Sequence, residues 1–497
     1  MRRFSLLGVA LCAILPNTIL AQQYSGNEVN HFGTQATEAA YNNFTSGAFV
    51  ADSLQDALDQ LGEQAEDISD LKSAVKQKVS PGHSKATMKI VGRVHADIWN
   101  FPGSSAGINA LEGAGIPSGS DSPQDRFGFR RLRFGVRGDL PSNMEYRIEM
   151  EFAPGNDVEF RDAWLGFKDL PLLQTLRIGN QKRPIGLDHW NSSRYNVFLE
   201  RPFIIEGDNQ DARRLGIQSW NSSDNQRWSW QYGIFNQRLI QDEGFYRSDH
   251  LQLQGVGRLA NTFWYDESSG GRGYGHWAIS GSWADVGGPR SDAAGNTGPD
   301  ASEARWRTRP EGRSTNRWLD TGTIAGANDF QELGFEGLLN FGPLQLVAEY
   351  QAYFINRDAG QTDLTLHGGY VYASYFLTGE HMAWDRKTNQ LARMIPHENF
   401  FRVRTCDGGI GRGLGAWQVA VRGSYADYSD DDINGGLGKA VTFGLNWYWT
   451  PYSRMQFNYI HGQIDDSWAI GSTNPGPGSP LVSGTYDIIG TRFMVDF

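Results

Sequence analysis

Cysteine is nearly absent from the sequence, with two among 497 residues, Cys12 and Cys406. Cys12 lies in an apolar run that follows Arg2 and Arg3 and ends before the small residue Ala21, a pattern typical of a cleaved secretory signal. We therefore expect residues 1–21 to be removed. A single remaining cysteine excludes a disulfide framework and a cysteine-based metal site in the mature chain.

Long hydrophobic runs are also missing. After the signal, no stretch approaches the roughly 20 apolar residues of a transmembrane helix, and the mean hydropathy is -0.48. Any crossing of a membrane must therefore use β-strands. Aromatic residues at 12% and 60 glycines fit a barrel with a polar interior and glycine-rich turns, although a secreted all-β enzyme could share these averages.

Catalytic and metal-binding patterns are missing as well. No Ser-His-Asp set or comparable pair of nucleophile and base stands out at the predicted strand ends. The ten histidines show no spacing that would hold a metal. We expect no enzyme activity and no cofactor, and we also expect no nucleic-acid partner.

The sequence does have a regular alternation of apolar and polar residues. Its last residues place Phe493, Val495 and Phe497 on one face and Arg492 and Asp496 on the other. A strand between lipid and a polar lumen requires this two-residue period with one apolar face. Read alone, the segment could also be an edge strand of a soluble protein.

The alternation recurs in about sixteen segments, which begin near residues 88, 127, 144, 159, 174, 213, 227, 250, 274, 331, 343, 368, 416, 439, 452 and 485. An even number is typical of bacterial single-chain barrels. We therefore predict an all-β fold, an antiparallel transmembrane β-barrel of about 16 strands over residues 83–497. Short connections are expected to be periplasmic and long ones external. Residues 378–415 break this rule, since they are long yet periplasmic by parity: either a strand is missed there or the turn is elaborated.

Residues 22–82 have a different pattern and are predicted to form a periplasmic N-terminal segment. Within it, Leu54, Leu61, Ile68 and Val75 recur every seven residues, which predicts a short helix with heptad character. A lone amphipathic helix and a coiled coil both fit this pattern. If the helix self-associates, it would tie protomers together.

Arginine is frequent on the polar face of the predicted strands. A guanidinium stays charged and offers a planar fork to phosphate or carboxylate oxygens, so a series of them inside a barrel could pass an anion along. The same faces also carry acids such as Glu149, Glu151 and Asp162, and the net charge is -11, which would repel anions at long range. Because charges at the constriction fix selectivity, these counts leave anion and cation preference open.

Several stretches along the predicted barrel resemble the phosphate-selective porin family, porins O and P. They are residues 177–187, 192–195, 198–201, 318–322, 342–350, 375–380, 415–417 and 444–448. The resemblance covers about residues 88–497. It implies a sixteen-stranded barrel, usually trimeric, through which anions such as phosphate or polyphosphate diffuse passively across an outer membrane.

The resemblance also implies where the pore narrows. In this family an infolded third external loop forms the constriction, and the matching loop here is residues 183–212. Arg194 and Arg201 lie in its motifs, and Arg130 and Arg131 match paired arginines of the second strand. Together with the inward candidates from the alternation, the predicted anion pathway comprises Arg93, Arg130, Arg131, Arg133, Arg147, Arg194, Arg201, Arg214 and Arg422.

The predicted function is thus an outer-membrane porin for small inorganic anions, with phosphate or polyphosphate among them. We expect a homotrimer embedded in the lipid of a bacterial outer membrane and exported through the cleaved signal. Two alternatives remain: a general or cation-preferring porin on the same fold, and a structural anchor barrel that does not conduct.

Overall fold

The computed structural model describes residues 85–113, 122–153, 158–208, 212–237, 252–286, 304–358, 360–405, 408–468 and 479–497. The chain divides into two compact units. One comprises Met1–Lys85 with Arg404–Gly411, and the other comprises Ala86–Val403 with Arg412–Phe497. The predicted signal peptide and the predicted N-terminal helix lie outside the described residues and stay predictions.

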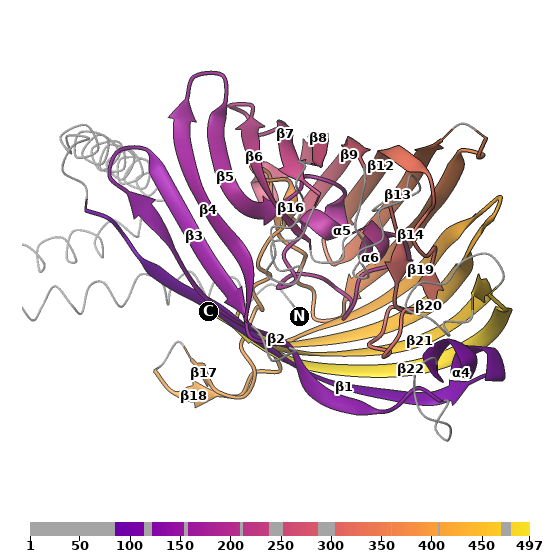
Figure 1. Cartoon of the computed structure of the whole chain (residues 1–497). Helices are drawn as coiled ribbons and strands as arrows, with labels where there is room; N and C mark the ends of the chain where they lie inside the picture. The colour runs from indigo at the N-terminus through magenta and orange to yellow at the C-terminus, as the bar shows by residue number, and fades with distance from the viewer. Residues whose placement is uncertain are drawn as a thin grey trace, which may run out of the picture. The chain divides into compact units, whose positions relative to one another are not determined.

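The second unit is a closed antiparallel β-barrel, for which the described residues supply sixteen strands (Figure 1). The strands, in order around the barrel, are β1 Lys89–Ser104, β2 Arg126–Leu140, β3 Met144–Glu151, β4 Glu159–Leu170, β5 Gln174–Lys182, β6 Arg213–Ser222, β7 Trp228–Asn236, β8 Leu253–Tyr265, β9 Gly273–Asp285, β12 Ala327–Phe341, β13 Leu344–Arg357, β14 Leu364–Phe376, β19 Ala416–Asp430, β20 Ile433–Thr450, β21 Ser453–Trp468 and β22 Leu481–Asp496. The all-β, sixteen-stranded prediction is confirmed. Among the described residues, no helix has the length and apolar character needed to cross a membrane.

The first and last strands close the barrel. In their antiparallel register Arg93 pairs with Asp496 and Val94 with Val495. The C-terminal Phe497 exchanges backbone hydrogen bonds with Gly92. A Cβ atom on Gly92 would lie 2.4 Å from the Phe497 ring, so glycine is needed where the terminal aromatic crosses β1. With every strand paired on both sides, the barrel leaves no strand edge unpaired.

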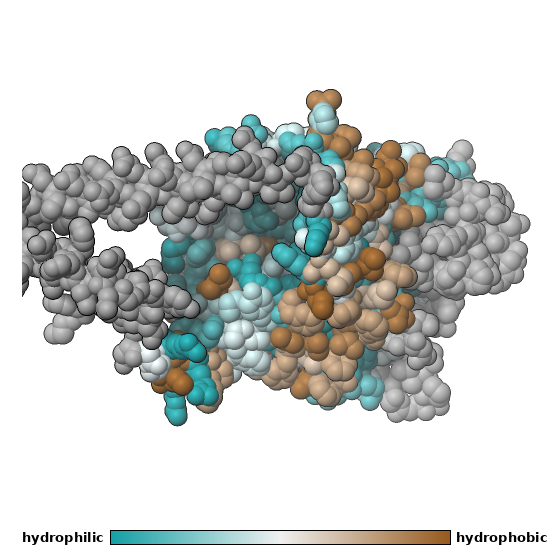
Figure 2. Space-filling model, turned by 90° about the vertical axis from the view of Figure 1, so that its left-hand side faces the viewer, coloured by the Kyte–Doolittle hydropathy of each residue, from teal (hydrophilic) through white to brown (hydrophobic). Residues whose placement is uncertain are grey.

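The two faces of the strands differ in chemistry, as the alternation predicts. On β22 and at the residue after it, Phe493, Val495 and Phe497 are exposed on the outside, whereas Arg492 and Asp496 are buried inside. Hydrophobic residues cover a broad part of the outer surface in Figure 2. This is the arrangement of a barrel with lipid outside and a polar lumen within.

Shorter elements lie in the connections. The helices are α4 Ala106–Gly113, α5 Leu187–Trp190, α6 Phe203–Asp208 and the 3-10 helix η1 Glu267–Ser269. Three two-stranded sheets pair β10 Arg307–Thr308 with β11 Leu319–Asp320, β15 Trp384–Asp385 with β16 Gln390–Leu391, and β17 Val403–Arg404 with β18 Ile410–Gly411. Figure 1 draws α5, α6 and β16 within the ring of strands, and these infolded parts shape the candidate site.

Candidate functional site: a basic cavity beside the infolded loops

The connection between β5 and β6, residues 183–212 and here called loop 3, folds into the barrel. Side chains of β20 to β22 hold its backbone carbonyls and amides at one wall. Asn446 donates to the Val197 oxygen at 2.9 Å, and Arg492 donates to the Leu199 oxygen at 2.6 Å. The Leu199 amide in turn donates to Asn458 at 2.8 Å. Buried polar groups on this wall are therefore used to fix loop 3.

Loop 3 begins at a tight contact with another part of the wall. Gly186 has a φ of 59°, and a Cβ atom there would lie 2.0 Å from a carboxylate oxygen of Glu349. The Asp188 amide donates to Glu349 at 3.1 Å. At the other end of α5, the Lys182 ammonium donates to the carbonyls of His189, Trp190 and Asn191 at 2.8, 3.2 and 2.6 Å. The short helix is thus held at both ends.

A second segment enters from the end of the barrel that carries the short turns. It belongs to the connection between β14 and β19, and residues 377–399 are here called the inner turn. The Trp190 indole donates to the Thr388 carbonyl at 3.0 Å, and the Leu391 amide donates to Asn191 at 2.9 Å. Since β14 pairs directly with β19, this long connection contains no missed barrel strand. It is an elaborated turn that packs against loop 3.

A third segment, residues 304–326 and here called loop 5, enters from the opposite end. Its Glu311 carboxylate is buried and accepts from Arg422 at 2.6 Å and from Thr442 at 3.1 Å. The Trp318 indole donates to Glu112 of α4 at 3.0 Å. Loop 5 is therefore fixed to the barrel wall and to the first external loop.

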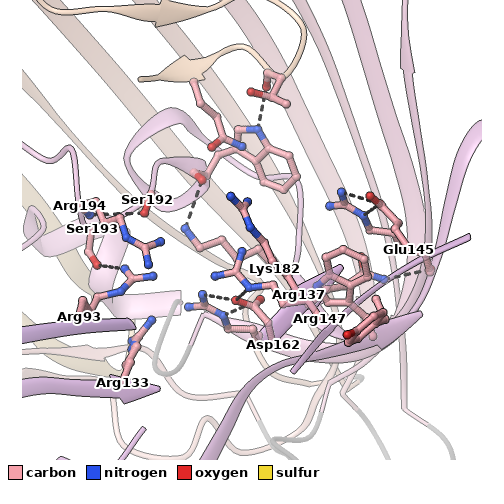
Figure 3. A pocket seen from close by; sticks show the side chains of 18 of the residues that line it. Arg93, Arg133, Arg137, Glu145, Arg147, Asp162, Lys182, Ser192, Ser193 and Arg194 are labelled. Carbon is pink, nitrogen blue, oxygen red and sulfur yellow. Dashed lines mark hydrogen bonds and ion pairs between the residues drawn. The ribbon is translucent and has the colours of Figure 1, made fainter. Parts of the chain in front are cut away.

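A cavity of about 530 Å³ remains beside these segments, along the inner faces of β1 to β6 (Figure 3). Four acidic side chains line it, namely Asp139, Glu145, Asp162 and Asp385. Eleven basic side chains line it, namely Lys89, Arg93, Arg131, Arg133, Arg137, Arg147, Arg177, Lys182, Arg194, Arg201 and Arg213. The local balance is therefore strongly positive although the whole chain carries -11.

Six of the nine arginines predicted for the anion pathway line this cavity: Arg93, Arg131, Arg133, Arg147, Arg194 and Arg201. They come from β1, β2, β3 and loop 3. In Figure 3 Arg93 and Arg194 lie close together beside Ser192 and Ser193, and Arg93 donates to the Ser193 hydroxyl at 2.8 Å. The structure thus brings residues about 100 positions apart in the sequence to one surface.

One buried carboxylate forms ion pairs with three of these arginines. Glu149 lies 3.4 Å from Arg93, 3.2 Å from Arg133 and 2.6 Å from Arg147, and its side chain has no exposed surface. Arg133 also pairs with Glu151 at 2.6 Å and Arg147 with Asp162 at 3.3 Å, so these carboxylates orient the three guanidinium groups and compensate much of their charge. Arg131 differs, because it makes no ion pair with any described residue, and its guanidinium lies 3.4 Å from Nδ1 of His95.

Two carboxylates of loop 3 have shifted pKa values. Burial raises the pKa of Asp188 above its usual range, although Arg201 lies 3.2 Å away and opposes the shift. Burial would also raise the pKa of Glu200, but the Arg130 and Arg492 guanidinium groups outweigh it and hold this pKa well below the usual range. Glu200 is therefore ionised, whereas Asp188 takes up a proton more readily than an ordinary aspartate.

The other three predicted arginines lie outside the cavity lining. Arg130 makes a bidentate ion pair with Glu200, at 2.7 and 2.9 Å. Arg422 donates to Glu311 and to the Glu200 carbonyl. Arg214 donates to the backbone carbonyls of Gln237 and Arg213. Their guanidinium groups hold loops or backbone in place.

The prediction of pathway residues missed some cavity residues. Arg213, the neighbour of Arg214, faces the cavity and pairs with Asp162 at 3.3 Å. Lys182 also lines it, as do Trp164 and Trp220. The alternation on β6 could have assigned Arg213 had the strand's register been known. Nothing in the local sequence marks Lys182 as the residue that caps α5.

The chain is similar to several known proteins. A relative from Caulobacter vibrioides, described as an uncharacterized protein, is 25% identical over 422 residues, which are 83% of this chain and 74% of that protein. OmpT of Vibrio cholerae is similar in structure with a TM-score of 0.46 and 13% identity, covering 83% of this chain and all of that one. An anion-selective porin from Comamonas acidovorans has a TM-score of 0.46 and 14% identity over 82% of this chain and all of that one.

The family assignment rests on a match to a family model. The family model for phosphate-selective porins O and P matches residues 117–497, which takes in nearly all of the barrel. That family and the closed barrel indicate an outer-membrane channel rather than an enzyme. This chain belongs to the phosphate-selective porin O and P family and is a porin of the bacterial outer membrane.

Proposed function

We propose that this porin lets small anions, phosphate among them, diffuse passively through the cavity along β1 to β6. The observation that carries the proposal is the charge of the cavity lining, with eleven basic and four acidic side chains. Charges at a narrow, partly desolvated passage outweigh charges spread over the outer surface. A net negative chain can therefore contain an anion-selective path.

The arrangement of the ion pairs supports a path rather than a tight binding site. Arg133, Arg147 and Arg93 share Glu149, so their charges are fixed in position and partly compensated. Arg131 and Arg137 make no ion pair with a described residue, so a solute anion gains most from them. Conduction requires that an ion bind favourably enough to enter the pore and weakly enough to leave it. Alternating paired and unpaired guanidinium groups would provide binding positions of different strength.

Phosphate is the proposed solute because guanidinium forks match its oxygens and because the family carries that description. We also propose, from the pattern of its N-terminal residues, that the mature chain lacks residues 1–21, and, from the resemblance, that three copies assemble in outer-membrane lipid. Chemical cross-linking of the purified porin in detergent tests the assembly, and a dimer or monomer would contradict it.

The test of the pore is a reversal potential in a potassium chloride gradient across a planar bilayer, followed by titration of phosphate against the chloride conductance. We expect anion selectivity and a decrease in chloride conductance as phosphate enters the path. Cation selectivity would contradict the proposal and indicate a general porin. Absence of conductance would indicate an anchor barrel.

A further inference from the structure

Aromatic side chains and cations alternate on the cavity wall near the short-turn end of β2 to β6. In the strand register Arg137 pairs with Arg147, and Arg147 pairs with Trp164. All three line the cavity. Neighbouring strands lie about 4.8 Å apart, so these residues form a continuous row in which Arg137 and Trp164 are two strands, or about 10 Å, apart.

The row continues through a stacked cation. The guanidinium of Arg177 lies 4.1 Å from the ring centre of Trp164 and 3.9 Å from that of Trp220. It also donates to Glu145 at 3.0 Å. Trp220 in turn packs against Trp190 of loop 3, with ring centres 5.0 Å apart. Because Glu145 compensates Arg177, the unbalanced positive charge of the row is at Arg137.

Inorganic anions make no use of these rings. A phosphate or chloride ion gains from donors and positive charge, while the face of an indole ring is electron-rich and apolar. Trp164 and Trp220 are partly exposed and line the cavity among many charged groups. A solute with its own flat ring and one negative group would use both parts of the row.

The size and charge of the cavity fit such a solute. Its volume of about 530 Å³ falls within the 300–1,000 Å³ of sites for small organic molecules. Arg137 is exposed and makes no ion pair with a described residue. A ring placed against Trp164 would put a carboxylate over Arg147 and within reach of the long Arg137 side chain.

We propose that this row, Arg137, Arg147, Trp164, Arg177 and Trp220, is a binding site for aromatic carboxylates of the benzoate class. The proposal rests on the proposed function, because the acid must enter by the same anion path. In this site the indole rings would stack on the ring of the solute, and Arg137 would bind its carboxylate. The competing structural explanation is that the two tryptophans only hold Arg177 in place.

The experiment compares two acids of equal charge and similar size on the purified porin in planar bilayers. Benzoate and cyclohexanecarboxylate are titrated against the chloride current, and the half-blocking concentrations are compared. We expect benzoate to block at a roughly fivefold lower concentration than its saturated analogue, since only benzoate stacks on an indole. Equal block by the two acids in a porin that prefers chloride over potassium would overturn this inference and leave the proposed function standing. Cation selectivity would overturn both.

Variants distinguish a binding site for the solute from a stack of tryptophans that only holds Arg177 in place. Trp164→Leu should remove the preference for benzoate, and Trp164→Phe, which keeps a ring, should retain most of it. Arg137→Gln should weaken block by both acids alike. Trp228→Leu is the matched control, because Trp228 is 40% exposed on the outer face. An unchanged preference in Trp164→Leu, in channels with wild-type chloride conductance, would overturn the proposal.

Discussion

Two walls of the barrel carry arginine on their inner faces but use it differently. On β19 to β22, Arg422, Arg454 and Arg492 donate to the carbonyls of Glu200, Asn196 and Leu199 of loop 3 at 3.0, 2.7 and 2.6 Å. On β1 to β3, Arg93, Arg131, Arg133 and Arg147 line the open cavity. The first wall binds the backbone of the loop, whereas the second mainly faces the space that the loop leaves, although its Arg93 also donates to Ser193 of the loop.

The difference teaches that the role of an inward-facing arginine depends on what lies opposite its guanidinium group. Where a loop presents unpaired backbone carbonyls, the guanidinium satisfies them and ceases to be available to a solute. Where the opposite side is water, the same residue type contributes its charge to the pore. The two walls therefore predict different phenotypes for mutations that look alike in the sequence.

The largest expected effect is at the ion pairs that fix loop 3 to the barrel. Glu200 accepts from Arg130 and from Arg492, and its side chain is 3% exposed. Glu200→Gln leaves both guanidinium groups without that charge, and breaking a buried ion pair costs about 3–5 kcal/mol. We expect a lower midpoint in urea unfolding of the detergent-solubilised porin and a noisier single-channel conductance as loop 3 loosens.

The control for Glu200→Gln is Glu145→Gln. Glu145 pairs with Arg177 alone, and its side chain is 20% exposed, so its removal should cost distinctly less. An unfolding midpoint for Glu200→Gln equal to that of the wild type would show that Glu200 does not hold loop 3.

On the cavity wall, the corresponding change is Glu149→Gln. It removes the carboxylate shared by Arg93, Arg133 and Arg147 and frees positive charge for the solute. An added charge at this depth is worth about 1 kcal/mol after screening, which corresponds to a roughly fivefold higher ratio of anion to cation permeability. Reversal potentials measure the ratio. A fall in anion preference would show that the carboxylate itself belongs to the path.

A matched pair of arginine variants compares the walls directly. Arg131→Gln removes a charge that makes no ion pair with a described residue, and we expect the anion to cation ratio to fall roughly threefold, about 0.7 kcal/mol. Arg454→Gln removes a donor to the Asn196 carbonyl, so we expect an unchanged ratio and a loss of stability of about 1–2 kcal/mol. Equal effects of the two variants on the reversal potential would remove the distinction between the walls.

Much of the barrel could be predicted because alternation is a local signal. The predicted starts near residues 144, 159, 174, 213 and 416 coincide with the first residues of β3, β4, β5, β6 and β19. Both faces of a strand are specified by its own residues, with lipid on one side and water on the other. The strand number and the closed barrel follow from counting such segments.

The contents of the lumen could not be predicted in the same way. The inner turn is fixed by contacts between distant residues, for example the Trp384 indole donating to Thr262 at 3.0 Å. No pattern within residues 377–399 predicts these contacts. Strict alternation would also place only one of Arg130 and Arg131 inside. A β-bulge leaves Arg130 without a partner on β1, since His95 pairs with Arg131 and Ala96 with Phe129, and both side chains then reach inward.

The smallest expected effect is a pH dependence that originates at the edge of the cavity. Because burial raises the pKa of Asp188, this residue takes up a proton at a pH above the usual aspartate value of about 3.9. A raised carboxyl pKa means that the protonated form is favoured in the folded porin, so acidification through this pKa stabilises the fold relative to an ordinary aspartate. Protonation also leaves Arg201, 3.2 Å away, without its counter-charge.

We therefore expect the anion to cation permeability ratio to rise modestly as the pH falls from neutral toward 4. Asp188→Asn should have the raised ratio already at neutral pH and should lose this part of the response, because the amide does not titrate. Asp432→Asn is the control, since Asp432 is an exposed carboxylate outside the cavity lining that pairs with Arg357 at 2.6 Å. If Asp188→Asn responds to pH as the wild type does, the response belongs to other carboxylates of the lumen. Asp188 would then only position Arg201, a role closer to that of the wall that holds loop 3.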